Sequence, residues 1–271
     1  MKLGIIGVGV VGSAIKHGFE KLGHDVKIHD TKYTTIYNQT TINDVLDTDV
    51  CFVCVPTVSL SDGECDVSIV KQVVGQLADM SFKGIVAIKS TVEPGTTCML
   101  QSKYSAQLTI CFVPEFLRER CAISDFVDNH DLCVIGTTDE AVYKMIKRSH
   151  GKFPKKFIMV NPLEAELCKY FSNVHNATQI IFANSFYEIC KKLGADYNVV
   201  KDSMVHRKTI FDHYLDCNEN IRGFGGVCLP KDTAAINNLV KRHKLDIKFF
   251  ETLLEENKKY RITVPGGMRL E

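Results

Sequence analysis

The sequence has almost no excess of charge of either sign. Its 271 residues include 33 Lys and Arg and 32 Asp and Glu, which gives a formal net charge of +1. Proteins that hold nucleic acid or an anionic membrane surface by a strong field carry a clear positive excess, so neither partner is expected. No apolar run reaches the length of a membrane span, and there is no internal repeat or low-complexity tract. A hydrophobic fraction of 45% is instead typical of a globular protein with one or two domains.

Cysteine is present in unusual number. The sequence has 11 cysteines, an odd count, and most lie in apolar runs typical of core strands and helices. Cys51 and Cys54 form a Cys-x-x-Cys pair, but an extended strand would point their side chains to opposite faces. We therefore expect buried, reduced thiols without structural disulfides and without a metal site, which indicates a cytoplasmic protein.

The first 30 residues have the pattern strand, glycine-rich turn, helix, strand. An apolar strand at residues 2–6 leads directly into Gly7, Gly9 and Gly12, helical spacing follows, and a second strand ends in Asp30. This context is what a dinucleotide-binding fingerprint requires, although another α/β protein can also carry a glycine-rich turn. Gly7 allows the tight turn, Gly9 lets the backbone approach the pyrophosphate, and Gly12 lets helix and strand pack closely.

The acid at the end of the second strand predicts which dinucleotide binds. Asp30 would hydrogen-bond the ribose hydroxyls and repel a 2′-phosphate, which favours NAD over NADP. Lys32 lies nearby and keeps NADP open as an alternative. The predicted cofactor is NAD, and the predicted contacts in this region are Gly7, Gly9, Val10, Val11, Gly12, Asp30 and Lys32.

Strands and helices continue to alternate up to residue 160. Apolar runs predict strands at residues 50–55, 84–89, 108–113 and 132–135, and helices at residues 67–80 and 139–150. Such alternation implies a mostly parallel sheet that is covered on both faces. The predicted fold class is therefore α/β, with an N-terminal Rossmann-type doubly wound parallel sheet over residues 1–160.

The pattern becomes purely helical after residue 160. Asn161 can cap a helix and Pro162 fits its first position, and no Pro or Gly interrupts until Gly194, a suitable C-terminal cap. This predicts one helix of about 48 Å at 1.5 Å per residue. Residues 161–271 are expected to form an all-helical domain on this central helix, with further helices at residues 198–206, 231–243 and 247–258.

The segment from Gly223 to Asp232 carries the strongest sign of chemistry. Glycines precede Cys228, and a Lys-Asp pair follows it. Glycines let the backbone approach a ligand closely, a neighbouring Lys favours the reactive thiolate, and an Asp can orient a partner or help to move a proton. Taken alone, the segment has a second interpretation as a surface loop with an incidental thiol.

Five motifs together resemble the UDP-glucose/GDP-mannose dehydrogenase family. The segment from Gly223 to Asp232 is one, and Lys169-x-x-x-Asn173 on the long helix is another. The other three each follow a predicted strand, and they are Val55-Pro56-Thr57, Ser90-Thr91-Val92-Glu93-Pro94-Gly95-Thr96 and Pro114-Glu115-Phe116-Leu117-Arg118-Glu119. The resemblance covers essentially the whole chain, with the motifs in order.

This resemblance implies an NAD-dependent, four-electron oxidation of a nucleotide sugar. The family oxidises C6 of the sugar from alcohol to carboxylate with two NAD and one water, and we expect UDP-glucose to be converted to UDP-glucuronate. GDP-mannose and UDP-N-acetylmannosamine are alternative substrates, and a non-catalytic NAD-binding remnant is a third interpretation. A β-hydroxyacid dehydrogenase also joins a Rossmann domain to a helical one, but it needs no thiol, so Cys228 argues against it.

The resemblance also implies roles for individual residues. Cys228 would hold the aldehyde as a thiohemiacetal and then as a thioester. Lys169 and Asn173, which share a helix face, would stabilise the oxyanions, although a solvated polar stripe has the same spacing. Thr91 and Asp232 would position a water, and Glu119 would assist thioester hydrolysis.

Binding residues are implied in the same way. Besides the fingerprint, the NAD contacts would be Pro56, Thr57, Thr91, Glu115 and Lys231. The sugar nucleotide would contact Glu115, Phe116, Leu117, Arg118, Glu119, Lys169, Asn173, Gly223, Phe224, Gly225, Gly226 and Cys228. A homodimer through the long helix is the expected assembly.

The chain departs from the family pattern in several places. Members usually continue into a second Rossmann-like domain that grips the nucleotide, and this sequence stops before it. Val58 stands where many members have a second Pro, and Arg120 replaces a small residue. Members of the family supply an arginine from one subunit to the site of the other. Arg207 and Arg222 are the two candidates for this residue in the present sequence.

Overall fold

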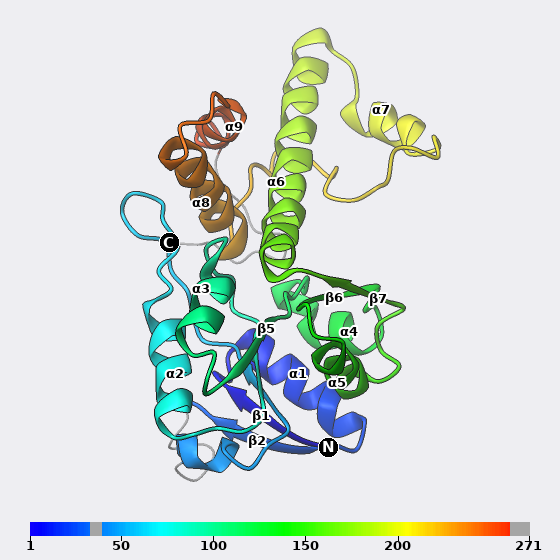
Figure 1. Ribbon diagram of the computed structural model, residues 1–271. Helices are drawn as coiled ribbons and strands as arrows, with labels where there is room; N and C mark the ends of the chain where they lie inside the picture. The colour runs from blue at the N-terminus through cyan, green and yellow to red at the C-terminus, as the bar shows by residue number, and fades with distance from the viewer. Residues whose placement is uncertain (33–39, 261–271) are drawn as a thin grey trace. The chain divides into compact units, whose positions relative to one another are not determined.

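Two compact units share the chain, and the computed structural model describes residues 1–32 and 40–260 of it (Figure 1). The first unit comprises Met1–Val58 and Asp66–Lys169. The second unit takes the short segment Ser59–Cys65 and the chain from Tyr170 onwards. Each unit is described by itself below. No helix in the described ranges is both long and apolar enough to cross a membrane.

The first unit is built on a seven-stranded sheet in the order β2-β1-β3-β4-β5-β6-β7. The strands are β1 (Lys2–Ile6), β2 (Asp25–His29), β3 (Val50–Val53), β4 (Ile85–Ile88), β5 (Thr109–Phe112), β6 (Leu132–Gly136) and β7 (Lys156–Val160). All neighbours pair in parallel except β5 and β6, which meet antiparallel at a single pair, Phe112 and Gly136. The predicted Rossmann-type, mostly parallel sheet is therefore confirmed.

Helices cover both faces of this sheet (Figure 1). They are α1 (Val10–Lys21), α2 (Ser68–Asp79), α3 (Thr96–Lys103), α4 (Ala122–Val127) and α5 (Glu140–His150), with 3₁₀ turns at η1 (Ile42–Val45) and η2 (Glu119–Cys121). Helices α1, α4 and α5 share one apolar core with the sheet. Phe19 of α1 is central to it, with ring centroids 5.0 Å from Phe52 and 5.5 Å from Phe126. Burying each such ring stabilises the fold by about 1.5–3 kcal/mol.

Three of these elements, β7, α3 and α4, were missing from the sequence prediction. β7 contains the apolar run Phe157-Ile158-Met159-Val160, which the predicted strands left unassigned, and as an edge strand it keeps all its side chains exposed or half-buried. α3 has no apolar stripe, since its buried residues are Thr96, Thr97 and Leu100. α4 has only six residues, which is too short for a helical period to show.

The long helix α6 (Pro162–Leu193) has the bounds that the sequence predicts. Asn161 and Glu164 cap its start reciprocally, because Asn161 Oδ1 accepts from the Glu164 N–H at 2.9 Å and Glu164 Oε2 accepts from the Asn161 N–H at 3.0 Å. Gly194 follows its end with φ of +75°, the left-handed conformation typical of a glycine cap. The helix begins in the first unit, and its residues from Tyr170 onwards belong to the second.

The second unit also contains α7 (Tyr197–Met204), α8 (Cys228–Arg242) and α9 (Phe249–Asn257). The predicted start of α8 at residue 231 is wrong, because the helix already begins at Cys228. Pro230 does not prevent this, since the N–H groups of a first helical turn have no partner within the helix. The segment Ser59–Cys65 lies against α8: Asn238 Nδ2 donates to the Asp62 carbonyl at 3.0 Å, and Gly63 lies beside Ala234.

Candidate functional site

The carboxyl ends of β1 and β3 form the expected cofactor edge. β1 has β2 on one side and β3 on the other, so the direction in which strands are added reverses between them. Ligands of open α/β sheets bind outside the carboxyl ends of the strands at such a switch point. The glycine-rich turn follows β1, and Pro56 and Thr57 come shortly after β3, so both predicted contact regions lie at this edge.

The three fingerprint glycines have different surroundings. A Cβ on Gly7, which has φ of +92°, would lie 2.6 Å from the Cys54 carbonyl oxygen, and one on Gly12 would lie 1.9 Å from the Gly7 oxygen. Gly9 has no atom within 4 Å of that position. Gly9 is also the N-cap of α1, whose first turn contains no acidic residue. The positive end of α1 and this open space fit a dinucleotide pyrophosphate.

Asp30 lies beside the glycine turn. Its Oδ2 accepts from the Val8 N–H at 2.6 Å and its Oδ1 accepts from the Lys32 N–H at 2.7 Å. These two bonds hold the carboxylate at the end of β2, where the ribose of NAD is expected. Val10 and Lys32 are exposed and Val11 is half-buried, so this end of the fingerprint is open to a ligand.

A buried ion pair in the first unit joins two of the predicted site residues. Lys169 Nζ donates to the carbonyl oxygen and to Oε1 of Glu115, at 2.8 Å each, and the two side chains are 3% and 9% exposed. Glu115 Oε2 also accepts from the Leu117 N–H at 2.7 Å, and Lys169 Nζ lies 5.9 Å from the centre of the Phe116 ring. Burial alone would raise the pKa of Glu115, but Lys169, the Leu117 N–H and Lys89 together hold it below its usual value. Glu115 is therefore an anion that holds Lys169 at the end of β5.

The segment after β4 is fixed by a residue that the sequence did not indicate. Glu166 of α6 is fully buried, and its two carboxylate oxygens accept from the Gly95 N–H at 2.5 Å and the Thr97 N–H at 2.8 Å. It thereby supplies the missing cap of α3 and holds the segment that carries the half-buried Thr91. Burial raises the pKa of Glu166, although the N–H donors oppose this. The signal in the sequence is an acid three residues before Lys169 on a helix with a buried face.

The rest of the segment after β5 is more exposed. Glu119 is an exposed residue of η2. Arg118 forms an ion pair with Asp125, with Arg118 Nη2 2.7 Å from Asp125 Oδ1. The guanidinium of Arg118 therefore helps to fix the fold of this segment, beside any contact with substrate.

A second cluster of predicted site residues lies within the second unit. Asp232 is fully buried, and its two oxygens accept from Asn173 Nδ2 and from Lys231 Nζ, each at 2.5 Å. Asn173 and Lys231 are themselves 7% and 8% exposed. The cluster gives the carboxylate a fixed direction, and Asn173 follows Lys169 by one turn on α6.

Cys228 is the first residue of α8 and is exposed. The positive end of a helix favours an anion such as a thiolate. Asp232 lies one turn further along the same helix, on the side of α8 that also carries Cys228. Of the glycines before Cys228, Gly223 and Gly226 have φ of +60° and +81°, the left-handed region that favours glycine. Gly223 and Phe224 are buried, and Gly225 is half-buried.

The remaining cysteines have a different character. None of the 11 forms a disulfide, and besides Cys228 only Cys98 is classed as exposed. Burial raises the pKa of Cys54 and of Cys133 to about 12, which keeps both as neutral thiols. That these thiols are reduced in the cell stays a prediction. Within residues 1–32 and 40–260 no group of three His, Cys, Asp or Glu side chains is placed to hold a metal ion.

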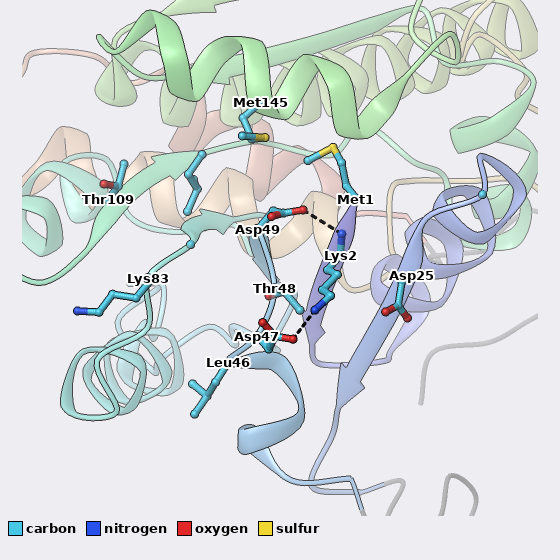
Figure 2. Close-up of a pocket in the computed structure, with 13 residues that line it drawn as sticks. Met1, Lys2, Asp25, Leu46, Asp47, Thr48, Asp49, Lys83, Thr109 and Met145 are labelled. Atoms are coloured by element: carbon cyan, nitrogen blue, oxygen red, sulfur yellow. Dashed lines mark hydrogen bonds and ion pairs between the residues drawn. The ribbon is translucent and has the colours of Figure 1, made fainter.

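A wide depression of about 830 Å³ lies at the opposite, amino ends of the strands (Figure 2). Lys2 bridges its acidic wall, because its Nζ donates to Asp47 at 2.5 Å and its backbone N–H donates to Asp49 at 2.9 Å. None of the predicted site residues lines it. The depression is therefore separate from the cofactor edge.

Comparison with known proteins gives the family. The model of the NAD-binding domain of the UDP-glucose/GDP-mannose dehydrogenase family matches residues 35–153, and the model of its central domain matches residues 163–259. The chain is 32% identical to the UDP-glucose 6-dehydrogenase of Rickettsia prowazekii (strain Madrid E) over 246 residues, which is 88% of this chain and 55% of the relative. It therefore spans about half the length of the curated relative that it matches.

Solved structures agree with this result. A UDP-glucose dehydrogenase from the archaeon Pyrobaculum islandicum superposes with a TM-score of 0.85 at 28% identity, over 95% of this chain and 68% of that one. A 3-hydroxyisobutyrate dehydrogenase from Mycobacterium tuberculosis has a TM-score of 0.74 at 13% identity, over 95% and 92%, which shows a common fold alone. The chain belongs to the UDP-glucose/GDP-mannose dehydrogenase family, and its cofactor is NAD.

Proposed function

We propose that the chain carries the catalytic groups of a nucleotide-sugar dehydrogenase that converts UDP-glucose to UDP-glucuronate through a covalent thioester. The observation that carries this proposal is the exposed Cys228 at the start of α8, one turn before the buried Asp232. A dehydrogenase that oxidises only once needs no thiol, whereas a four-electron oxidation must hold its aldehyde between two hydride transfers. The relatives that are named UDP-glucose 6-dehydrogenases favour UDP-glucose over GDP-mannose and UDP-N-acetylmannosamine.

The two domains divide the work. We assign NAD binding to residues 1–160, with the pyrophosphate at the start of α1 and the ribose at Asp30. We assign the nucleophile Cys228 to the helical domain at residues 161–271; Lys169 lies on the helix that opens this domain, in the part of it that packs with the first unit. NAD supplies the chemistry of the acceptor, because it takes up one hydride from C6 in each of the two oxidations.

In the first oxidation, the proton of the C6 hydroxyl passes to a water held by Thr91 and Asp232. Lys169 and Asn173 donate to the oxygen as negative charge develops on it, and the C6–H electron pair leaves as hydride. The Glu115 carboxylate keeps the ammonium of Lys169 in a fixed direction through its two bonds of 2.8 Å. Preorganised donors of this kind stabilise an alkoxide without reorganising during the reaction.

In the second oxidation, the thiolate of Cys228 adds to the aldehyde carbon. A C–S bond forms, and Lys169 and Asn173 stabilise the resulting oxyanion. Loss of the second hydride gives a thioester, which water attacks with help from Glu119 and Asp232. The C–S bond then breaks. The carboxylate product is released, and Cys228 returns to the thiolate form. In sum, one alcohol, two NAD⁺ and one water give one carboxylate, two NADH and three protons.

We also propose a homodimer in the cytoplasm. Phe182, Phe186, Ile189 and Leu193 of α6 are exposed and follow each other at helical spacing, so they form an apolar stripe that a second copy can cover. Static light scattering at assay concentration tests the dimer, and a monomer would contradict it. The free thiols favour a reducing compartment.

The deciding experiment is an assay of NADH formation with UDP-glucose, GDP-mannose and UDP-N-acetylmannosamine in separate reactions. We expect two NADH for each UDP-glucose consumed. Cys228→Ala should reduce uronate formation by on the order of 10³-fold or more, since nucleophile removal typically costs that much. Cys98→Ala removes the other exposed thiol and should retain activity. NAD binding without NADH formation from any of the three sugars would instead support a non-catalytic remnant.

A further inference from the structure

Two buried asparagines hold the loop that leads to Cys228. Asn184 of α6 accepts with Oδ1 from the Gly223 N–H at 3.2 Å and from Arg222 Nε at 2.9 Å. Asn257, the last residue of α9, accepts with Oδ1 from the Phe224 N–H at 2.7 Å and donates from Nδ2 to the Phe224 carbonyl at 2.9 Å. Side chains of α6 and α9 thus hydrogen-bond to two consecutive residues of this loop, Gly223 and Phe224.

Both amides are fixed in direction. Asn184 is 1% exposed and Asn257 is 6% exposed. The Nδ2 of Asn184 donates to the Ile180 carbonyl at 2.8 Å, which leaves its Oδ1 for the loop. A buried side-chain amide without such partners is costly, so each asparagine stabilises one particular position of the loop backbone.

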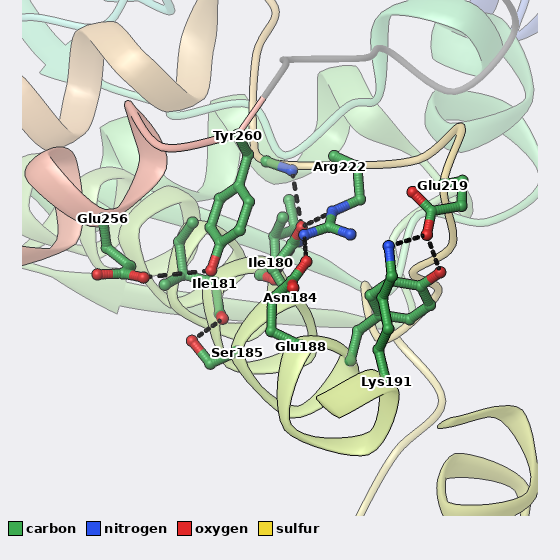
Figure 3. A network of polar contacts seen from close by, with 12 residues as sticks. Ile180, Ile181, Asn184, Ser185, Glu188, Lys191, Glu219, Arg222, Glu256 and Tyr260 are labelled. Carbon is green, nitrogen blue, oxygen red and sulfur yellow. Dashed lines mark hydrogen bonds and ion pairs between the residues drawn. The ribbon is translucent and has the colours of Figure 1, made fainter. Parts of the chain in front are cut away.

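Arg222 adds a third attachment at the start of the loop (Figure 3). The Cζ of its guanidinium lies 4.7 Å from the centre of the Tyr187 ring and 4.9 Å from that of Tyr260, and the group forms an ion pair with Glu188. Cation–π contacts to two rings, the ion pair with Glu188 and the bond to Asn184 together restrict this side chain. The backbone is therefore held at residues 222–224, directly before Gly225 and Gly226.

We infer that Asn184 and Asn257 are positioning residues for the nucleophile, which they do not touch themselves. The loop between Phe224 and Cys228 contains two glycines and would otherwise sample many conformations. Fixing Gly223 and Phe224 lets α8 begin at Cys228, so that the thiol stands at the positive end of the helix. This inference rests on the proposed role of Cys228. It adds two residues, from α6 and α9, that no sequence motif marked.

The test is the rate at which iodoacetamide alkylates Cys228, measured by peptide mass spectrometry across the neutral and mildly alkaline range. Cys98 is exposed on α3 in the other unit and serves as the internal reference. Asn257→Ala and Asn184→Leu should each slow Cys228 relative to Cys98 by roughly two- to fivefold, the size of a helix-end effect on an anion, and move the rate profile to higher pH.

Two variants separate positioning from stability. Asn184→Asp keeps the oxygen that accepts from Gly223 and Arg222, so its Cys228 rate should stay close to that of the parent and clearly above that of Asn184→Leu. Val240→Ala creates a cavity in the buried face of the same α8 and should lower the melting temperature without changing the ratio of the two rates. If Asn257→Ala proves too unstable to purify, Asn257→Asp keeps the acceptor, loses the donor to Phe224 and should show a smaller slowing.

One result would overturn the inference. If Asn257→Ala and Asn184→Leu melt at lower temperature but alkylate Cys228 as fast as Val240→Ala does, the two asparagines only support the fold. Alkylation needs no nucleotide sugar and no turnover. A parent protein that forms no NADH would therefore refute the proposed function while leaving this measurement intact, and the reverse outcome is equally distinguishable.

Discussion

Lys169 donates to two oxygens of the same residue, the carbonyl and the carboxylate of Glu115, at 2.8 Å each. The two residues are 54 positions apart, and both are almost fully buried. The pair therefore fixes an ammonium group on α6 relative to the end of β5. It also sets a requirement, because neither partner can be removed without leaving a buried charge.

The first prediction concerns this pair. Lys169→Met should lower the free energy of unfolding by about 3–5 kcal/mol, because the Glu115 carboxylate loses its buried partner. The folded-state pKa of Glu115 lies below its usual value. The stabilisation that the ionised carboxylate gives to the folded state is therefore present at neutral pH and is lost as pH falls through that lowered pKa. The difference between parent and variant should therefore shrink in acid. Urea denaturation at several pH values measures both effects.

The control for this prediction is Lys191→Met. Lys191 pairs with Glu219 on the surface, and both side chains are more than half exposed. Its loss should cost less than about 1 kcal/mol. If the two variants had the same urea midpoint, the pair of Lys169 and Glu115 would not carry the stability assigned to it.

The second prediction contrasts two fingerprint glycines. Gly12→Ala should destabilise the first unit, because its Cβ would lie 1.9 Å from the Gly7 oxygen. Gly9→Ala meets no atom within 4 Å, so the melting temperature should stay close to that of the parent. The methyl group would instead occupy the approach of the pyrophosphate, and NADH affinity should fall by roughly tenfold or more, the loss expected when one good hydrogen bond to a charged group is broken.

Thermal melting and titration of NADH fluorescence together check the contrast. The two measurements separate a defect in folding from a defect in binding. Gly9→Ala with unchanged NADH affinity would contradict the placement of the pyrophosphate at the start of α1. Gly12→Ala with an unchanged melting temperature would contradict the close contact of helix and strand.

The third prediction concerns stability in acid. His130 and His150 lie in the aromatic core around Phe126. Burial, with a contribution from Lys89, lowers the pKa of His130 to about 4 and that of His150 well below its usual value. The unfolded chain therefore binds more protons than the folded chain below about pH 6.5, so stability falls as pH decreases from there towards the folded pKa values.

His130→Phe should reduce the slope of the free energy of unfolding against pH in this acidic range. The reduction can reach about 1.4 kcal/mol per pH unit, which is the limit for one proton. Urea midpoints near neutrality and in mild acid measure the slope. His17→Gln, a change of an exposed histidine on α1, is the matched control and should leave the slope as it is. An unchanged slope in His130→Phe would show that this histidine does not couple protonation to folding.

Much of the fold could be predicted because local signals and tertiary structure agree. The spacing of Gly7, Gly9 and Gly12 before a helix sufficed for the Rossmann unit, and the two ends of α6 follow from Asn161 and Gly194. The failures occurred where the signal is absent or misleading. The buried residues of α3 include two threonines and form no apolar stripe, and Pro230 concealed the true start of α8.

The site divides in the same way. Cys228, Asp232, Lys169 and Asn173 lie in motifs whose residue types suggest their chemistry. The hydrogen-bond partners of these residues cannot be predicted in this way. The pairing of Lys169 with Glu115, for example, depends on how a distant strand end is packed. Glu166, Asn184 and Asn257 act through backbone groups of other segments. No local pattern predicts which backbone N–H a buried acid or amide will meet.

The segment Ser59–Cys65 has a consequence for dissecting this protein. It belongs to the helical unit although the chain on both sides of it belongs to the NAD-binding unit. A fragment starting at Tyr170 would lack Asp62, whose carbonyl accepts from Asn238. A fragment ending at Lys169 would contain the segment Ser59–Cys65 without the helix α8 against which it packs. Because of this interleaved connectivity, neither unit can be replaced as one continuous stretch of chain. A chimera that joins a different cofactor-binding domain to these helices must therefore also contain the segment Ser59–Cys65.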